Sequence, residues 1–391
     1  MKRRIDHMLV FSFVLLLIVP LASELWLKEG DIEPLKGTFR KAKPIKLSWD
    51  NWKSKQWQQR QEEIVKKNLS IKPSVVRVQH EIDYKLFNVF HMGDLLVGKD
   101  GYYFSWGWAD RRCCVNSLNI DATRLFVEKL KLLSDLFKQK GKYMRIIIAP
   151  SKEEIFSDKL PDRYARENPD NDYHRYRNLL DKNQIEYWDL LDYYRIIMDT
   201  ASHPIYSPTS VHWTKYGASF TTFRLLEDMN KYFKNRMNTL YVKDMELSQF
   251  VHKDGDTEAT LNLISRIDTS SNFLYYSYGV NYVQDSFKPR VLTLADSYYG
   301  AIKDCQQLPE IYSAESKYLY YYSQAHYTHG NKTEMVKDLN IAYEFKNADA
   351  FILLNSSHNL KDFPFGFQHD IGQIIKALKT LPDVEGAQHS K

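Results

Sequence analysis

Val291-Leu-Thr-Leu-Ala-Asp-Ser-Tyr-Tyr-Gly300 begins as a short apolar run of strand-forming residues and stops abruptly at Asp296-Ser297. In a parallel α/β sheet, ligands bind in the crevice beyond the carboxyl ends of the strands. A serine at such an end presents its hydroxyl to this crevice, so Ser297 is a candidate nucleophile. Because a serine hydroxyl needs an adjacent base to become reactive, the rest of the chain must supply a partner.

Helices and strands alternate on both sides of this segment. A helical pattern of apolar residues from Phe126 to Phe137 ends at Gly141, and the apolar run 144–149 is typical of a buried strand. Near-continuous apolar strands between amphipathic helices predict a three-layer α/β/α domain with a mostly parallel sheet. Further strands are predicted near 185–188, 291–294, 318–322 and 350–354, and further helices after Thr214, over 333–345 and over 371–381.

The first residues are typical of a membrane-directed segment. Lys2-Arg3-Arg4 precedes the apolar run Met8–Ala22, and Leu25-Trp26 extends that run. Basic residues before an apolar run predict a secretory signal or a signal anchor with its N-terminus inside. The sequence Pro20-Leu-Ala22 is a poor cleavage site, which favours a retained anchor.

Three regions follow from this pattern. Residues 1–26 form the expected signal anchor. Residues 27–80 are rich in Lys, Gln, Glu and Trp and predict a stalk or an arm packed on the domain surface. Residues 81–391 form the expected α/β domain, which the anchor would place outside the cytoplasm.

The composition narrows the class of protein. The 391-residue chain is 43% hydrophobic and 14% aromatic, which is typical of a globular fold. Its net charge of +5 comes from interspersed acidic and basic residues, so no basic stripe indicates nucleic-acid binding. Cys113 or Cys114 could pair with Cys305 in an oxidising compartment. Adjacent cysteines lack metal-ligand spacing, and we expect neither a metal site nor a cofactor.

A candidate base lies in the segment Pro208–Ala218. There a loop carries His212-Trp213 directly into the helix predicted after Thr214. A neutral imidazole can take a proton from a serine and later return it, which acyl transfer requires of its general base. We therefore pair His212 with Ser297 as candidate catalytic residues. Asn355 follows the strand 350–354 and could face the same crevice as a polar substrate contact, although asparagine there also forms turns.

Four segments carry a resemblance to a known family. They are Val97-Gly-Lys-Asp-Gly-Tyr-Tyr-Phe104, Ile148-Ala-Pro-Ser-Lys152, His212-Trp-Thr-x-x-Gly-Ala218 and Asp296-Ser297. These segments resemble motifs of the SGNH-hydrolase-like domain in the alginate O-acetyltransferase family, the AlgJ and AlgX proteins. The histidine precedes the serine, as in that family and unlike in ordinary SGNH esterases. The resemblance covers residues 85–360, and the N-terminal anchor is closer to the AlgJ-like arrangement.

The resemblance implies an O-acetyltransferase of the cell envelope with its domain outside the cytoplasm. Ser297 would take an acetyl group as an ester and pass it to a hydroxyl of an exopolysaccharide or cell-envelope glycan. His212 would act as base and then as acid, and a membrane-bound O-acyltransferase would supply the acetyl group. The backbone N–H groups of Ser297 and Tyr298 are the expected oxyanion donors.

The sequence departs from the family pattern at two positions. The motif Asp-x-His of the family is Ser210-Val211-His212 here, and its Gly-Asp-Ser is Ala295-Asp296-Ser297. Loss of the orienting carboxylate costs a serine protease about 10⁴-fold in turnover. Ser210, Asp296 or another carboxylate of the fold could support His212. A carbohydrate acetylesterase and a non-catalytic glycan-binding or assembly subunit stay open as alternatives.

Overall fold

The computed structural model of the chain describes residues 2–28, 30–37, 42–114, 118–247, 255–267 and 274–384. The chain forms two units, of which the smaller comprises Met1–Gly93 and Thr257–Thr269. The larger unit comprises Asp94–Asp256 and Ser270–Lys391. The region boundaries expected after residues 26 and 80 both fall inside the smaller unit.

The smaller unit is mostly helical. Within helix α1 (Lys2–Trp26), the segment His7–Trp26 has a mean hydropathy of 2.4 and is long and apolar enough to cross a membrane. An N-terminal signal sequence has the same properties, so the helix fits either an anchor or a signal. Glu81 accepts hydrogen bonds from the backbone and hydroxyl of Ser265, at 3.1 and 2.5 Å. Three more helices are α2 (Trp49–Lys53), α3 (Gln56–Asn68) and α4 (Lys72–Phe87).

A seven-stranded sheet forms the centre of the larger unit, in the order β10-β9-β8-β7-β11-β3-β4. The strands from β8 to β4 pair in parallel, and β9 and β10 add antiparallel pairs at one edge. The mostly parallel sheet is therefore confirmed. Its strands are β3 (Tyr143–Ala149), β4 (Tyr187–Asp189), β7 (Val291–Ala295), β8 (Lys317–Tyr320), β9 (Gln324–Tyr327), β10 (Thr333–Met335) and β11 (Ala350–Ser356).

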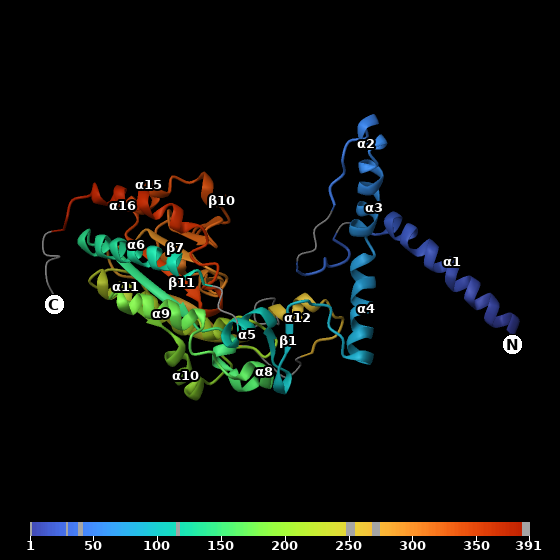
Figure 1. The fold of residues 1–391 in the computed structure, drawn as a ribbon, viewed down its shortest axis with the longest axis horizontal. Coiled ribbons are helices and arrows are strands. Elements are labelled where there is room, and N and C mark those ends of the chain that lie inside the picture. Colours follow the sequence, from blue (N-terminus) through green and yellow to red (C-terminus); the bar gives the residue numbers. More distant parts are fainter. Residues whose placement is uncertain are drawn as a thin grey trace. The chain divides into compact units, whose positions relative to one another are not determined.

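Helices cover both faces of this sheet. On one face, Phe351 of β11 packs against Phe137 of α6 (Ile120–Gln139) and Phe345 of α15 (Ile341–Asn347). On the other face, Tyr143 of β3 packs against Tyr232 of α11 (Lys215–Tyr232). In Figure 1, β7 and β11 accordingly lie between the pair α15 and α16 (Ile371–Lys379) and α11. This is the expected three-layer α/β/α arrangement of an SGNH-hydrolase-like domain.

Shorter elements complete the larger unit. A small antiparallel pair joins β1 (Leu95–Val97) to β2 (Tyr103–Ser105), and a separate ribbon joins β5 (Thr239–Leu247) to β6 (Leu274–Asn281). The remaining helices are α5 (Trp106–Cys113), α7 (Lys152–Ile155), α8 (Asp162–Ala165), α9 (Asp172–Lys182), α10 (Leu191–Thr200), α13 (Tyr299–Lys303) and α14 (Leu308–Ile311). Helix α12 (Asp256–Leu261) begins at the last residue of the unit's first segment.

Two predicted elements end or begin elsewhere in the structure. The strand predicted over 318–322 stops at Tyr320, because Tyr321 and Tyr322 have φ angles of 46° and 49°. Left-handed residues cannot continue a strand. The helix predicted over 333–345 starts only with α15, because Thr333–Met335 pairs with β9 as the strand β10.

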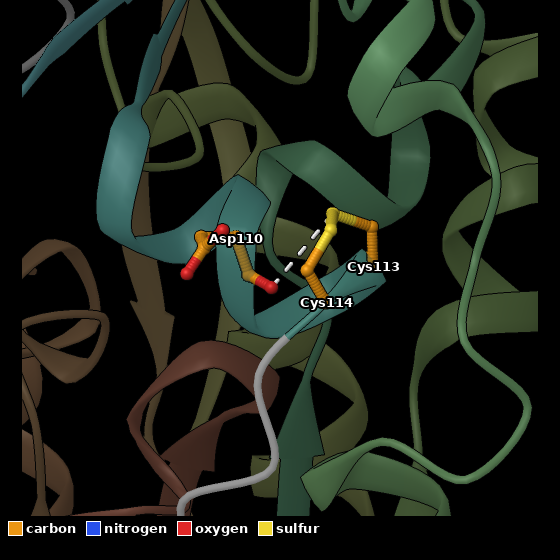
Figure 2. A group of neighbouring side chains, drawn as sticks. All are labelled: Asp110, Cys113 and Cys114. Atoms are coloured by element: carbon orange, nitrogen blue, oxygen red, sulfur yellow. Dashed lines mark hydrogen bonds between the residues drawn. A yellow bond between two sulfur atoms is a disulfide. The ribbon is translucent and has the colours of Figure 1, made fainter.

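Cys113 and Cys114, at the end of α5, form a disulfide with each other (Figure 2). Cys305 is free and buried, so its expected pairing with either of them is not formed. In the part of the chain that the structure describes, Asp110 and these two cysteines form one group with ligand atoms close enough for a metal ion. A sulfur binds metal as a thiolate, and the disulfide leaves neither sulfur in that form.

Candidate active site

Four neighbouring strands end at one edge of the sheet, and a polar residue follows each of them. Ser297 follows β7, and Tyr321 follows β8. Asn359 follows β11 at the end of the short helix η4 (Ser357–Asn359), and Lys152 follows β3. The carboxyl ends of parallel strands form the crevice in which α/β proteins bind ligands, so these residues surround the position expected for a reactive group.

Ser297, His212 and Asp256 form a hydrogen-bonded chain. His212 Nε2 lies 2.7 Å from Ser297 Oγ, and His212 Nδ1 is hydrogen-bonded to the carboxylate of Asp256. Asp256 lies 44 residues beyond His212 and belongs to the segment between β5 and β6. A carboxylate on Nδ1 holds the imidazole in the tautomer whose Nε2 can accept a proton from the serine. This geometry can support acyl transfer through the serine.

The electrostatics of this chain match its geometry. Burial disfavours the charged form of His212, but the neighbouring carboxylate of Asp256 outweighs burial and raises the pKa of His212 above its usual value. Burial likewise opposes the charge of Asp256, yet His212 and the hydrogen bonds from Ser210 and Val211 hold the pKa of Asp256 below its usual value. The pair therefore favours the imidazolium that forms when His212 takes a proton.

Ser210 supports this arrangement through Asp256. Its hydroxyl donates to Asp256 Oδ1 at 2.8 Å, and the backbone N–H of Val211 donates to the same oxygen at 3.1 Å. The Ser210 hydroxyl also accepts from the backbone N–H of His212 at 3.2 Å. Ser210 thus orients the carboxylate, whose charge comes from a different part of the chain.

The segment after His212 explains its sequence pattern. The hydroxyl of Thr214 caps α11 by accepting from the backbone N–H of Gly217 at 2.9 Å. A Cβ atom at Gly217 would lie 2.2 Å from the carbonyl oxygen of Ile205, so only glycine fits there. The Thr-x-x-Gly pattern therefore fixes the start of the helix directly behind the candidate base.

Reciprocal hydrogen bonds join the histidine loop to the serine turn. The indole of Trp213 donates to the carbonyl of Tyr298 at 3.0 Å, and the hydroxyl of Tyr298 donates to the carbonyl of Val211 at 3.0 Å. Both side chains are almost completely buried, with exposures of 1% and 0%. These two anchors stand on either side of His212 and Ser297 and keep the two side chains facing each other.

Lys152 stabilises the loop that carries His212 through hydrogen bonds to backbone carbonyls. Its ammonium donates to the carbonyls of Tyr103, Pro208 and Ser210 at 2.8, 2.6 and 2.9 Å. The side chain is fully buried, and burial lowers the pKa of Lys152 to about 7. Three carbonyl acceptors match the three donors of an ammonium group, which favours the charged form at this position. Two of the three carbonyls belong to the loop that carries His212.

Asp296 is not the residue that orients His212, because the hydrogen-bond partner of His212 Nδ1 is Asp256. The charge of Asp296 only adds to that of Asp256 in raising the pKa of His212. The Asp296 carboxylate accepts from the backbone N–H of Tyr298 at 3.0 Å, from the backbone and hydroxyl of Ser356, and from Asn359 Nδ2 at 3.0 Å. The side chain is completely buried. Asp296 therefore ties the serine turn to the end of β11 and leaves the imidazole to Asp256.

This network also changes the set of oxyanion donors. The backbone N–H of Tyr298, one of the two expected donors, is already bonded to Asp296. The hydroxyl of Tyr321 lies 3.3 Å from Ser297 Oγ, and Asn359 Nδ2 lies 3.3 Å from the same hydroxyl. Tyr321 reaches this place because its left-handed backbone turns it away from the strand. The backbone N–H of Ser297 and the hydroxyl of Tyr321 are thus the better candidates.

Asn355 occupies a different position from the one expected of a substrate contact. It is the penultimate residue of β11, only 3% exposed, and its amide donates to the carbonyl of Ser356 at 3.0 Å. Its side-chain oxygen is buried without a hydrogen-bond partner. Asn359, four residues later, is the asparagine whose side chain reaches the serine turn.

Sequence reasoning brought together Ser297, His212 and Ser210, and it missed Asp256, Tyr321 and Asn359. Lys152 stood in a segment that carried the resemblance, but it was given no role. No short spacing links Asp256 to His212, because a loop and a ribbon separate them. Tyr321 was hidden in a run of tyrosines that resembles a strand. Lys152 had a signal, since a lysine directly after a buried apolar strand has few ways to reach solvent.

Residues 95–271 match the family described as "SGNH hydrolase-like domain, acetyltransferase AlgX", which confirms the resemblance expected from the sequence over that range. No curated protein matches the chain. Among solved structures, the O-acetyltransferase domain of Pseudomonas putida AlgJ is 15% identical, with a TM-score of 0.44, and the match covers 72% of this chain and 99% of that domain.

Two further solved structures are similar at the same level. Pseudomonas aeruginosa AlgX is 12% identical, with a TM-score of 0.42, over 73% of this chain and 67% of that one. Bacillus cereus PatB1 is 13% identical, with a TM-score of 0.41, over 68% of this chain and 96% of that one.

Proposed function

We propose that this chain is an extracytoplasmic O-acetyltransferase that moves an acetyl group through an ester on Ser297 to a hydroxyl of an exopolysaccharide or cell-envelope glycan. The observation that carries the proposal is the chain Ser297, His212 and Asp256, with 2.7 Å between the hydroxyl and imidazole atoms. The match of residues 95–271 to an acetyltransferase domain supports the choice of acyl group.

The reaction has two half-steps. In the first, Ser297 Oγ attacks the carbonyl carbon of an acetyl donor while His212 Nε2 takes the hydroxyl proton and returns it to the leaving group. In the second, a glycan hydroxyl gives its proton to His212 and attacks the acetyl-serine, and the proton passes to Ser297 as its ester bond breaks. Asp256 stabilises the imidazolium in both steps.

The oxyanion forms on the acetyl oxygen in both half-steps. The backbone N–H of Ser297 and the hydroxyl of Tyr321 would donate to it, and Asn359 would hold that hydroxyl in place. A membrane-bound O-acyltransferase would deliver the acetyl group, because the usual acetyl donors are cytoplasmic. The apolar helix α1 would hold the domain at the membrane where this delivery takes place.

Asp256 also bears on the non-catalytic alternative. That alternative drew its support from the serine at position 210, where the family has an aspartate. A carboxylate on His212 Nδ1 removes this support, since the triad has an acid from another segment. The acetylesterase alternative uses the same residues and differs only in whether water or a glycan hydroxyl attacks the acetyl-serine.

The test uses the full-length chain in detergent with p-nitrophenyl acetate as the acetyl donor. We expect intact mass spectrometry to show one added acetyl group on Ser297, and Ser297→Ala to show none. Addition of oligosaccharides should then remove the acetyl group and yield acetylated sugar. Equal acetylation of the parent and Ser297→Ala would refute the serine mechanism, and release of acetate alone with every sugar would identify an esterase.

A further inference from the structure

A pocket outside the triad lies between the ribbon β5–β6 and the helices α11 and α13. We call it the ribbon pocket, and its volume is about 160 Å³. One water molecule needs only about 10–15 Å³ of such space. The ribbon pocket is therefore roughly tenfold larger than the space for one water. Residues from both strands of the ribbon, from α11 and from the segment after α13 line it, including Tyr276, Tyr278, Ser219, Asp304 and Gln306.

Two tyrosine rings on β6 form its aromatic side. Tyr276 packs against Tyr216 with 5.2 Å between ring centres, and Tyr278 packs against Phe223 at 5.6 Å. Tyr216 and Phe223 belong to α11. Both rings of β6 stay partly exposed although they are held from behind. Rings that are already immobilised lose little conformational freedom when a ligand packs on them.

Polar groups form the rest of the lining. Ser219 and Thr222 line the pocket from α11; their hydroxyls donate to the carbonyls of Tyr216 and Ala218, so each can only accept from a ligand. The exposed amide of Gln306 lies at the rim and can both donate and accept. Glu246 and Asp304 contribute two acidic groups and Lys215 one basic group, which gives the lining a net charge of −1. Lys215 Nζ lies 4.8 Å from the ring centre of Tyr275.

These groups match the chemistry of a sugar unit. A pyranose ring has C–H groups that pack on an aromatic face and hydroxyls that bond to amides, hydroxyls and carboxylates. A net negative lining disfavours an acidic sugar, because like charges repel. We propose that the ribbon pocket binds an uncharged hexose or N-acetylhexosamine unit of the acceptor glycan, away from the unit that is acetylated.

The ribbon pocket is close to the triad along the chain. Lys215 is the first residue of α11, three residues after His212, and α13 begins two residues after Ser297. At 1.5 Å per helical residue, Thr222 lies about 12 Å along α11 from its cap. A glycan chain laid across this surface can therefore occupy the pocket and the triad together. This inference rests on the proposed function, because it assigns the acceptor of the same reaction.

The test measures binding and acylation separately on the full-length chain in detergent. Cellohexaose and chitohexaose serve as neutral probes and hexamannuronate as the acidic one, with binding measured by calorimetry on Ser297→Ala to prevent turnover. We expect a neutral probe to bind more tightly than hexamannuronate. Tyr276→Ala and Gln306→Trp should each weaken that binding about tenfold, because the first removes a ring contact and the second fills the pocket.

The controls separate this proposal from the triad chemistry and from misfolding. Tyr282→Ala removes a tyrosine that is 70% exposed, just after β6 and outside the pocket, and should bind like the parent. When the native Ser297 is kept, Tyr276→Ala and Gln306→Trp should still form acetyl-enzyme with p-nitrophenyl acetate. Gln306→Trp is the decisive variant, because it removes no packed side chain.

Three outcomes would overturn the ribbon pocket as a sugar site. They are no binding of either neutral probe to Ser297→Ala, tighter binding of hexamannuronate than of the neutral probes, and unchanged affinity when Gln306→Trp is added. Failure of the proposed function looks different: Ser297 would not be acetylated, while the effects of the pocket variants on sugar binding would persist.

Discussion

Asp296 and Asp256 both lie next to the proposed catalytic pair, Ser297 and His212, but they reach it from different parts of the fold. Asp296 is part of the strand end that carries Ser297, is completely buried, and accepts hydrogen bonds from three other residues of the sheet edge. Asp256 begins a short helix between two strands of a ribbon, and its side chain is 25% exposed. One aspartate holds the fold at the site, and the other holds the imidazole.

The comparison shows that a strand end and a loop contribute different properties. The strand end supplies position, because its residues are fixed by the sheet on both sides. The loop supplies the charge next to His212, because Asp256 reaches His212 Nδ1 from outside the sheet and its side chain stays 25% exposed. A carboxylate that is fully buried needs several donors to stay ionised, and those donors restrict where it can point.

The largest expected effect separates the two roles. Asp256→Asn should lower the turnover of p-nitrophenyl acetate about 10⁴-fold, because the imidazolium loses its carboxylate and the wrong tautomer is favoured. The fold should keep its thermal stability, since Asp256 lies outside the sheet. Stopped-flow kinetics of acetyl-enzyme formation and thermal unfolding by tryptophan fluorescence measure the two quantities.

Asp244→Asn is the matched control for that substitution, because Asp244 is an exposed carboxylate on β5 of the same ribbon. The acid limb of the pH profile gives a second readout. Burial lowers the pKa of His212 and the Asp256 carboxylate raises it, so the limb should move to lower pH in Asp256→Asn. An unchanged turnover and pH profile would mean that Asp256 is not the triad acid.

The second effect is on stability. Asp296→Ala should lower the free energy of unfolding of the larger unit by about 3 kcal/mol, because four buried donors from three residues lose their acceptor. Its acetyl-enzyme formation should fall as well, since the turn that holds Ser297 is tied by those bonds. A thermal midpoint equal to that of Asp256→Asn would erase the distinction between the two aspartates.

The sequence predicted the strand end that carries Ser297, but it did not predict that Asp256 would contact His212. The apolar runs 291–294 and 350–354 were predicted as strands from composition and periodicity, and they lie in β7 and β11. The pairing of His212 with Ser297 followed from motif order. Asp256 could not be found in this way, because its contact depends on the path of a 44-residue excursion and not on local pattern. Tyr321 was missed because a left-handed backbone at tyrosine has no sequence signature.

A third, intermediate effect tests whether Lys152 holds the loop that carries His212 as firmly as the sheet holds the strand end at Ser297. Lys152→Met keeps the length of the side chain and removes the ammonium donor from the carbonyls of Tyr103, Pro208 and Ser210. Pro208 keeps its second bond, from the backbone N–H of Tyr103. We expect kcat for p-nitrophenyl acetate to fall about 10–100-fold, because small displacements of a base are costly, while KM stays nearly constant.

Lys159→Met is the control for this variant. Lys159 forms surface ion pairs with Asp100 and Asp158, and such pairs contribute little to stability. If Lys152→Met raised KM and left kcat unchanged, the lysine would act on substrate binding instead of on the position of His212.

The smallest effect is expected at Ser210, which contacts both Asp256 and the backbone of His212. Ser210→Ala removes one hydrogen bond to Asp256 and should lower turnover about fivefold, the equivalent of about 1 kcal/mol. If Ser210 acts through Asp256, the same substitution should have no further effect in Asp256→Ala, and the double-mutant cycle should show a coupling of similar size. Additive losses would instead mean that Ser210 acts on His212 directly, through the bond that it accepts from the His212 backbone N–H at 3.2 Å. Ser210 would then act with the loop that carries His212. Asp256 would orient the imidazole without help from residue 210, the position at which the family has its aspartate.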